Sequence, residues 1–157
     1  MVFKTSRRLA VALMIGAIVA ACAGPPPPKQ PDPTVAQVTL SATKDSNPDP
    51  TGRASPAVVF IYALQPGAPF ATGSYDALTG GELGELGETM KRIARLVIVP
   101  GKTTKKIFEL PDGTSDIGIA VGFRQIDTAK WRASASVKAN EVTLLKATVA
   151  ANQVNVE

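Results

Sequence analysis

Few residues in this sequence are of a type and spacing that could do chemistry, and Cys22 is the first of them. It is the only cysteine among the 157 residues, and the chain has no histidine. The chain therefore lacks histidine-based acid–base catalysis, a Cys–His nucleophile and the common zinc ligand sets. A hydrolase using serine or paired carboxylates would need groups from distant strands, and no such pair stands out. We expect no enzyme, metal site, cofactor, small-molecule substrate or intrachain disulfide.

The segment that precedes Cys22 has the three parts of an export signal. Basic residues at positions 4, 7 and 8 are followed by an apolar run of 13 residues, from 9 to 21. That run is shorter than the roughly 20 residues that a spanning helix needs. Its end, Val19-Ala20-Ala21-Cys22, resembles the lipobox of bacterial lipoproteins, which implies that residues 1–21 are removed and that Cys22 carries covalent lipid. The alternative is a plain signal peptide cleaved at an Ala-x-Ala site, with Cys22 incidental.

The residues after Cys22 predict where the lipid anchor is delivered and how it is joined to the domain. In the sorting rule of bacterial lipoproteins an aspartate at the next position retains the protein in the inner membrane, so Ala23 implies the periplasmic face of the outer membrane. Prolines at 25–28, 31 and 33 favour an extended polyproline II conformation. Residues 22–33 are therefore predicted to be a stiff linker, which would hold the domain on the order of 30 Å from the membrane. A proline-rich ligand for a binding groove is the alternative interpretation.

The charge of the chain argues against a nucleic-acid partner. The formal net charge of +4 includes three basic residues of the signal segment, and their removal leaves 14 Lys and Arg against 13 Asp and Glu. A nucleic-acid-binding domain usually carries a clustered basic stripe, and a mature charge near +1 does not suggest one.

From residue 34 onward the sequence has the period-2 pattern of β-strands. Ala36, Val38 and Leu40 share one face of a first strand. Residues 44–56 are rich in proline, glycine, Asp and Asn, and are predicted to form a long, exposed loop. Residues 57–64 are continuously apolar and rich in β-branched residues, which indicates a central strand buried on both faces.

The strand pattern stops between residues 65 and 91 and then resumes. Ser74 is a candidate cap for a short helical turn through Leu78, and Leu83, Leu86 and Met90 recur at helical spacing. Further strands are predicted at 93–99, 105–110, 117–124, 131–137, 142–149 and 154–156. Seven or eight short strands predict an all-β, two-sheet β-sandwich over residues 34–157.

Three features of the later strands bear on binding. Gly118, Ala120 and Gly122 form a flat face that packs either against the helical turns or against another protein. Trp131 is interpreted as a core residue. Lysines at 102, 105 and 106 suggest an edge strand protected from aggregation, with a contact to anionic lipid or a partner as the alternative.

Several stretches in order and spacing resemble one family, the outer-membrane lipoprotein of the bacterial type VI secretion system, TssJ. They are Asn47-Pro48-Asp49, Gly52-Arg53, Ser55-Pro56, the strand 58–64, Phe70, the Tyr75–Leu78 turn, Val99-Pro100-Gly101, residues 117–124, and Asp127 with Trp131-Arg132. The resemblance implies a transthyretin-like β-sandwich that anchors and does not catalyse. It also implies binding to the periplasmic part of the inner-membrane protein TssM, within a complex that contains TssL.

In this family the loop after the first strand is implicated in holding TssM. The corresponding residues here are Lys44, Asp45, Ser46, Asn47, Pro48, Asp49, Pro50, Thr51, Gly52, Arg53 and Ala54. Among them Asp45, Asn47, Asp49 and Arg53 are the side chains that we consider candidates for partner contact. A solvated connector without a partner is the alternative for the loop. For the whole chain, the alternative is a lipoprotein β-sandwich that serves a pilus, an adhesin or outer-membrane biogenesis.

Overall fold

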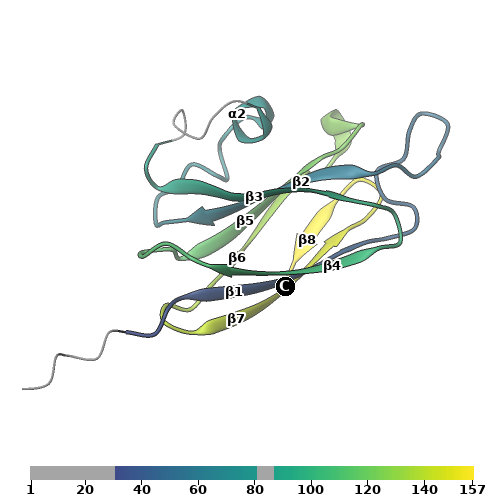
Figure 1. The fold of residues 1–157 in the computed structure, drawn as a ribbon. Helices are drawn as coiled ribbons and strands as arrows, with labels where there is room; N and C mark the ends of the chain where they lie inside the picture. Colours follow the sequence, from purple (N-terminus) through teal and green to yellow (C-terminus); the bar gives the residue numbers. More distant parts are fainter. Residues whose placement is uncertain (1–30, 81–86) are drawn as a thin grey trace, which may run out of the picture. The chain divides into compact units, whose positions relative to one another are not determined.

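The computed structural model describes residues 31–80 and 87–157, which form two four-stranded sheets that share one core (Figure 1). The strands are β1 (Val35–Ala42), β2 (Ala57–Leu64), β3 (Met90–Ile98), β4 (Thr103–Glu109), β5 (Asp116–Gly122), β6 (Arg132–Ser136), β7 (Val142–Val149) and β8 (Val154–Val156). The predicted all-β, two-sheet sandwich is confirmed. The signal segment, Cys22, Ala23 and prolines 25–28 lie outside the described residues, and so do Leu83 and Leu86.

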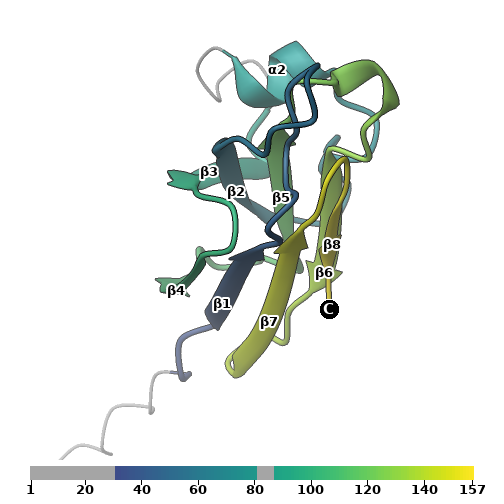
Figure 2. The same cartoon turned by 90° about the vertical axis from the view of Figure 1, so that its right-hand side faces the viewer.

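The two sheets have the strand orders β4-β1-β7-β8 and β3-β2-β5-β6. Strand β1 pairs antiparallel with β4 and parallel with β7, so it is a central strand with neighbours on both sides. Strands β6 and β8 lie together on one side of the domain, and β3 and β4 lie on the other (Figure 2). Strand β4 is therefore an edge strand, which places Lys105 and Lys106 where the sequence predicts them.

The main core fills the space between the sheets, and alternating residues of the strands build it. Along β1 every second residue is buried, beginning with Ala36 and ending with Ala42. Ile117, Ile119 and Val121 of β5 are fully buried on the facing sheet. This is the arrangement that the period-2 pattern of both segments predicts.

A second cluster covers the outer face of the β2 sheet. Alternate residues of β2, namely Phe60, Tyr62 and Leu64, turn away from the main core and pack with Phe70, Leu78, Met90 and Ala120. Leu78 belongs to the short helix α2 (Tyr75–Thr79), which Ser74 caps by accepting a hydrogen bond from the Ala77 N–H at 3.2 Å. The Tyr62 hydroxyl donates to the Leu78 carbonyl. Strand β2 is thus buried on both faces, as predicted, and α2 lies above its sheet in Figure 1.

The flat face of β5 packs against this covering segment. A Cβ atom built on Gly118 would lie 2.9 Å from two ring atoms of Phe70, and one on Gly122 would lie 3.3 Å from the Tyr75 hydroxyl. These glycines let the 65–80 segment approach the sheet closely. The structure thus decides the question left open by the sequence: the small residues serve contacts within the domain.

One local prediction differs from the structure, and one short element was not predicted. Met90, which follows the helical spacing of Leu83 and Leu86, is the first residue of β3 and is buried in the second cluster. The spacing of Met90 from the two leucines matches a helix only by coincidence, because pairing with Leu64 in the sheet decides the conformation of Met90. The short 3-10 helix η3 (Ile126–Thr128) has no signal in the sequence analysis. Trp131 is partly buried and packs against both clusters, in keeping with its predicted core role.

Candidate functional site

The candidate loop joins β1 to β2, and Asn47 ties its neck to the rest of the domain. Asn47 is 2% exposed and has a φ of 49°, a left-handed conformation that asparagine tolerates better than most residues. Its side-chain Nδ2 donates to the Pro56 carbonyl at 2.9 Å, and its Oδ1 accepts from the Arg124 N–H at 2.8 Å. Its backbone N–H donates to the Ala151 carbonyl at 3.0 Å. One residue, through its side chain and its backbone, therefore joins both ends of the loop to two other loops.

Asp49 organises the tip of the loop. Its Oδ1 accepts hydrogen bonds from the Thr51 hydroxyl at 2.6 Å, the Thr51 N–H at 2.9 Å and the Arg53 N–H at 3.0 Å. Its Oδ2 lies 3.1 Å from Arg53 Nε, forming an ion pair. The turn closes with a bond from the Gly52 N–H to the Asp49 carbonyl at 2.8 Å, and Gly52 has a φ of 84° that favours glycine.

The same contacts favour the charged form of Asp49. Hydrogen bonds from the Thr51 hydroxyl and then from the Arg53 backbone lower the Asp49 pKa from 3.8 to about 2. The carboxylate is ionised at any pH near neutral, so the tip of the loop is a preformed turn with Arg53 at its surface.

The structure corrects the prediction that the loop is exposed throughout. Ser46 and Asn47 are buried, at 1% and 2% exposure, because they pack and bond at the neck of the loop. Asp49 is mostly covered by its own turn, with a side chain 11% exposed, whereas that of Arg53 is 82% exposed. The exposed residues of the predicted loop 44–56 are Lys44, Asp45, Pro50, Thr51, Gly52, Arg53 and Pro56. Of the four candidate contact residues, Asp45 and Arg53 are accessible, while Asn47 and Asp49 hold the loop in shape.

A hollow of about 420 Å³ lies beside the loop, and the sequence analysis did not find it. It is lined by Asp45, Thr128, Lys130, Ala150, Ala151, Asn152 and Gln153. These residues come from the β1–β2 loop, from η3 and the segment after it, and from the β7–β8 turn. The Lys130 N–H bond to the Asn152 carbonyl at 2.9 Å joins the last two, and the Asn47 N–H bond to the Ala151 carbonyl joins the β1–β2 loop to the turn. No local pattern connects three segments so far apart in sequence, so only the fold could place them together.

The described residues contain no group of three or more His, Cys, Asp or Glu that could hold a metal ion. Asp116 accepts hydrogen bonds from the hydroxyls of Ser115 at 2.7 Å and Ser136 at 2.8 Å, which ties β5 to β6.

Within residues 31–80 and 87–157, no helix has both the length and the apolar composition needed to cross a bilayer.

Comparison with known proteins gives the family. Residues 34–157 match the family model T6SS-SciN, described as type VI secretion lipoprotein, VasD, EvfM, TssJ, VC_A0113. The chain belongs to the type VI secretion lipoprotein family. The TssJ resemblance seen in the sequence is thereby confirmed. A search of curated proteins found no match.

Solved structures share the fold of this type VI secretion lipoprotein. The TssJ1 lipoprotein of Pseudomonas aeruginosa is similar with a TM-score of 0.74 at 25% identity, covering 80% of this chain and 95% of that one. Lip of Serratia marcescens, a membrane-bound component of the type VI secretion system, gives 0.71 at 15% identity, covering 80% and 96%. A structure named TssM C-terminal domain from EAEC gives 0.61 at 19% identity, covering 79% and 98%. The last two likenesses concern the fold alone.

Membership in this family defines the general role of the protein. The family is a lipoprotein component of the type VI secretion system.

Proposed function

We propose that this lipoprotein anchors the type VI secretion membrane complex to the outer membrane. In this proposal, lipid on Cys22 holds the chain at the periplasmic face, and the β1–β2 loop binds the periplasmic part of TssM in a complex that also contains TssL. The lipid, the role of Ala23 in sorting and the role of the linker rest on the sequence. Family membership supports the proposal, and it argues against an accessory role in a pilus, an adhesin or outer-membrane biogenesis.

The observation that carries the proposal is the position of the two attachment points at opposite ends of β1. The linker from Cys22 enters at Val35, and the candidate loop leaves after Ala42 (Figure 1). Strand β1 pairs with β4 from Val35 to Ser41 and with β7 from Val35 to Ala42. Hydrogen bonds in a ladder run across the strands, so a pull along β1 loads many of them together. This geometry suits a chain that links a membrane to a partner under tension.

The shape of the loop also favours binding. A loop that is already ordered loses less conformational entropy when a partner docks. Asp49 sets the turn, and Asn47 fixes the neck, so Arg53 and Asp45 are presented from a defined surface. The hollow beside Asp45 offers a place for a protruding side chain of the partner.

The test is binding of the mature chain, with Cys22→Ser to keep it soluble, to the periplasmic part of TssM, measured by calorimetry. Arg53→Gln removes an exposed charge but keeps the backbone donor to Asp49, and Asp45→Lys reverses the charge at the hollow. We expect each to weaken binding by about tenfold or more, as for interface residues that contribute about 1.4 kcal/mol. Lys91→Glu, an exposed change on β3, is the matched control.

The stability of each variant separates binding from folding. Since Arg53 and Asp45 are exposed, their variants should unfold at the temperature of the parent chain. Unchanged affinity in both variants would show that the loop is not part of the interface. Absence of any binding by the parent chain would refute the TssM partnership itself.

A further inference from the structure

Among residues 31–80 and 87–157, the outer face of the β4-β1-β7 sheet carries most of the exposed large apolar side chains. Ile107 is 70% exposed, Leu144 is 69% exposed and Val142 is 61% exposed, and all three lie on this face. The others, Val97 and Val99, lie on or just after β3 of the other sheet. An apolar patch on a flat sheet marks an interaction surface more often than scattered single residues do.

The register of the strands places the apolar residues in the centre of this face. Ile107 and Leu144 are both direct partners of Gln37 in the middle strand, so the three form one row across the sheet. The adjoining row, nearer the start of β1, has Glu109 on one side and Val142 on the other.

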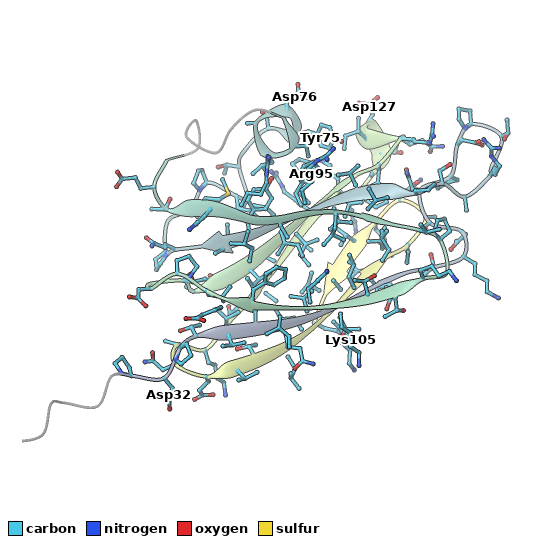
Figure 3. All side chains as sticks on the ribbon, viewed as in Figure 1. Asp32, Tyr75, Asp76, Arg95, Lys105 and Asp127 are labelled. Carbon is cyan, nitrogen blue, oxygen red and sulfur yellow. The ribbon has the colours of Figure 1, made fainter. Side chains whose placement is uncertain are left out.

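Lysines occupy the row on the opposite side of the centre. Lys105 and Lys146 are both partners of Thr39. Figure 3 shows the Lys105 side chain directed away from the interior of the domain. Along the face, therefore, an acidic residue, an apolar row and two lysines follow one another in the direction of β1.

This order is complementary to itself, and we propose that the face binds the same face of a second copy of the chain, with the two β1 strands antiparallel. A two-fold axis that crosses the strands at Gln37 would set Ile107 against Ile107 and Leu144 against Leu144 of the other copy. It would also set Glu109 against Lys105 twice, once for each copy. Two sheets stacked in this way lie about 10 Å apart, within reach of these side chains.

The charges disfavour the parallel arrangement. A two-fold axis along β1 would keep the apolar row in contact but would set Lys105 of each copy against Lys146 of the other. Like charges that face each other across an interface are unfavourable and suppress that mode of association. The antiparallel pair is thus the one that satisfies both the apolar row and the charges.

The size of the face predicts a weak pair. Three strands about 4.8 Å apart and seven residues long, at about 3.3 Å each, cover roughly 300 Å² on each copy. A stable interface needs about 800 Å² on each partner. Association is therefore expected at high micromolar concentration and would be strengthened when copies are held together in an assembly.

Both linkers of an antiparallel pair can reach one membrane. The starts of the two β1 strands lie two residues on either side of the axis at Gln37, so they are separated by roughly 13 Å along the strands and about 10 Å between the sheets. A segment of about 12 residues can reach up to roughly 37 Å, which exceeds that separation, so both copies can be attached to the same membrane.

The experiment is sedimentation velocity of the mature chain with Cys22→Ser, from low micromolar concentration to about 1 mM. We expect concentration-dependent dimers in the parent chain, weakened about tenfold by Lys105→Glu or by Glu109→Lys. Each single change places like charges in contact twice, and the double variant reverses both pairs, so it should recover the parent affinity. Leu144→Asp should abolish the dimer, whereas Val97→Asp, on the other sheet, should leave it unchanged.

Three results would overturn the proposal. They are a parent chain that stays monomeric at about 1 mM, single charge variants that associate like the parent, and a double variant that fails to recover. Thermal unfolding of each variant shows that it is folded. A monomeric chain that instead pellets with phosphatidylglycerol vesicles would assign the face to the membrane. This proposal needs neither the lipid nor TssM, so it can fail while the proposed function stands.

Discussion

Replacement of Asn47 tests whether the neck of the loop is held as the structure indicates. Asn47→Ala removes two side-chain hydrogen bonds, one to the Pro56 carbonyl and one from the Arg124 N–H. Each such bond contributes about 1 kcal/mol net to the free energy of unfolding. The φ of 49° adds about 1 kcal/mol, because alanine is less favourable in the left-handed region. The expected loss is about 3 kcal/mol.

A glycine variant separates the two contributions. Asn47→Gly also loses the side-chain bonds, but it adopts a positive φ without steric strain, so we expect a loss of about 2 kcal/mol. Arg53→Gln, which changes an exposed residue of the same loop, is the matched control and should change stability by less than about 0.5 kcal/mol.

Urea unfolding of the mature chain with Cys22→Ser, followed by circular dichroism, measures these free energies. The alanine variant should also melt about 10 °C below the parent, given the size of the domain. An alanine variant within about 0.5 kcal/mol of the parent would refute the assigned role of Asn47. If the alanine and glycine variants lose equal free energy of unfolding, the positive φ at residue 47 contributes nothing to the loss.

Three further predictions concern other parts of the chain. Because the Asp49 pKa is lowered to about 2, the bonds at the loop tip should be fully present above pH 4 and lost as the pH falls through 2, which amide exchange at Thr51 would report. Protection that stays unchanged at about pH 1 contradicts this. Gly118→Ala should reduce the free energy of unfolding by about 1–3 kcal/mol, since the new Cβ meets Phe70 at 2.9 Å, and unaltered stability would show that the 65–80 segment is displaced easily. Cys22→Ser in the full precursor should block labelling with palmitate and leave the signal segment attached, whereas continued labelling would reject the lipid anchor.

Most of the strands could be predicted from the sequence because their signal is local. Alternation of Ala36, Val38 and Leu40 implies a strand with one buried face, whatever its neighbours are. The apolar run of β2 likewise required cover on both faces, and the structure provides it. Met90 shows the limit of such reasoning, since three residues at helical spacing were too few to outweigh sheet pairing.

The candidate loop was predictable as a loop, but its internal roles were not. Proline, glycine and asparagine indicate turns wherever they cluster. Asn47 is held in place by bonds to Arg124 and Ala151, which are distant in sequence and close only in the fold. For this reason, two of the four candidate contact residues support the shape of the loop, and only two face solvent.

The sequence by itself determined the sandwich class, the family resemblance and the predicted lipid attachment at Cys22, because periodicity and short motifs are properties of neighbouring residues. Only the tertiary structure decided that the small residues of β5 receive the 65–80 segment and that Lys105, Ile107 and Leu144 share one outer face. Those facts depend on strand order and register, which the pairing of distant segments sets. Such pairing is chosen by the burial of the whole core, and no single segment carries that information.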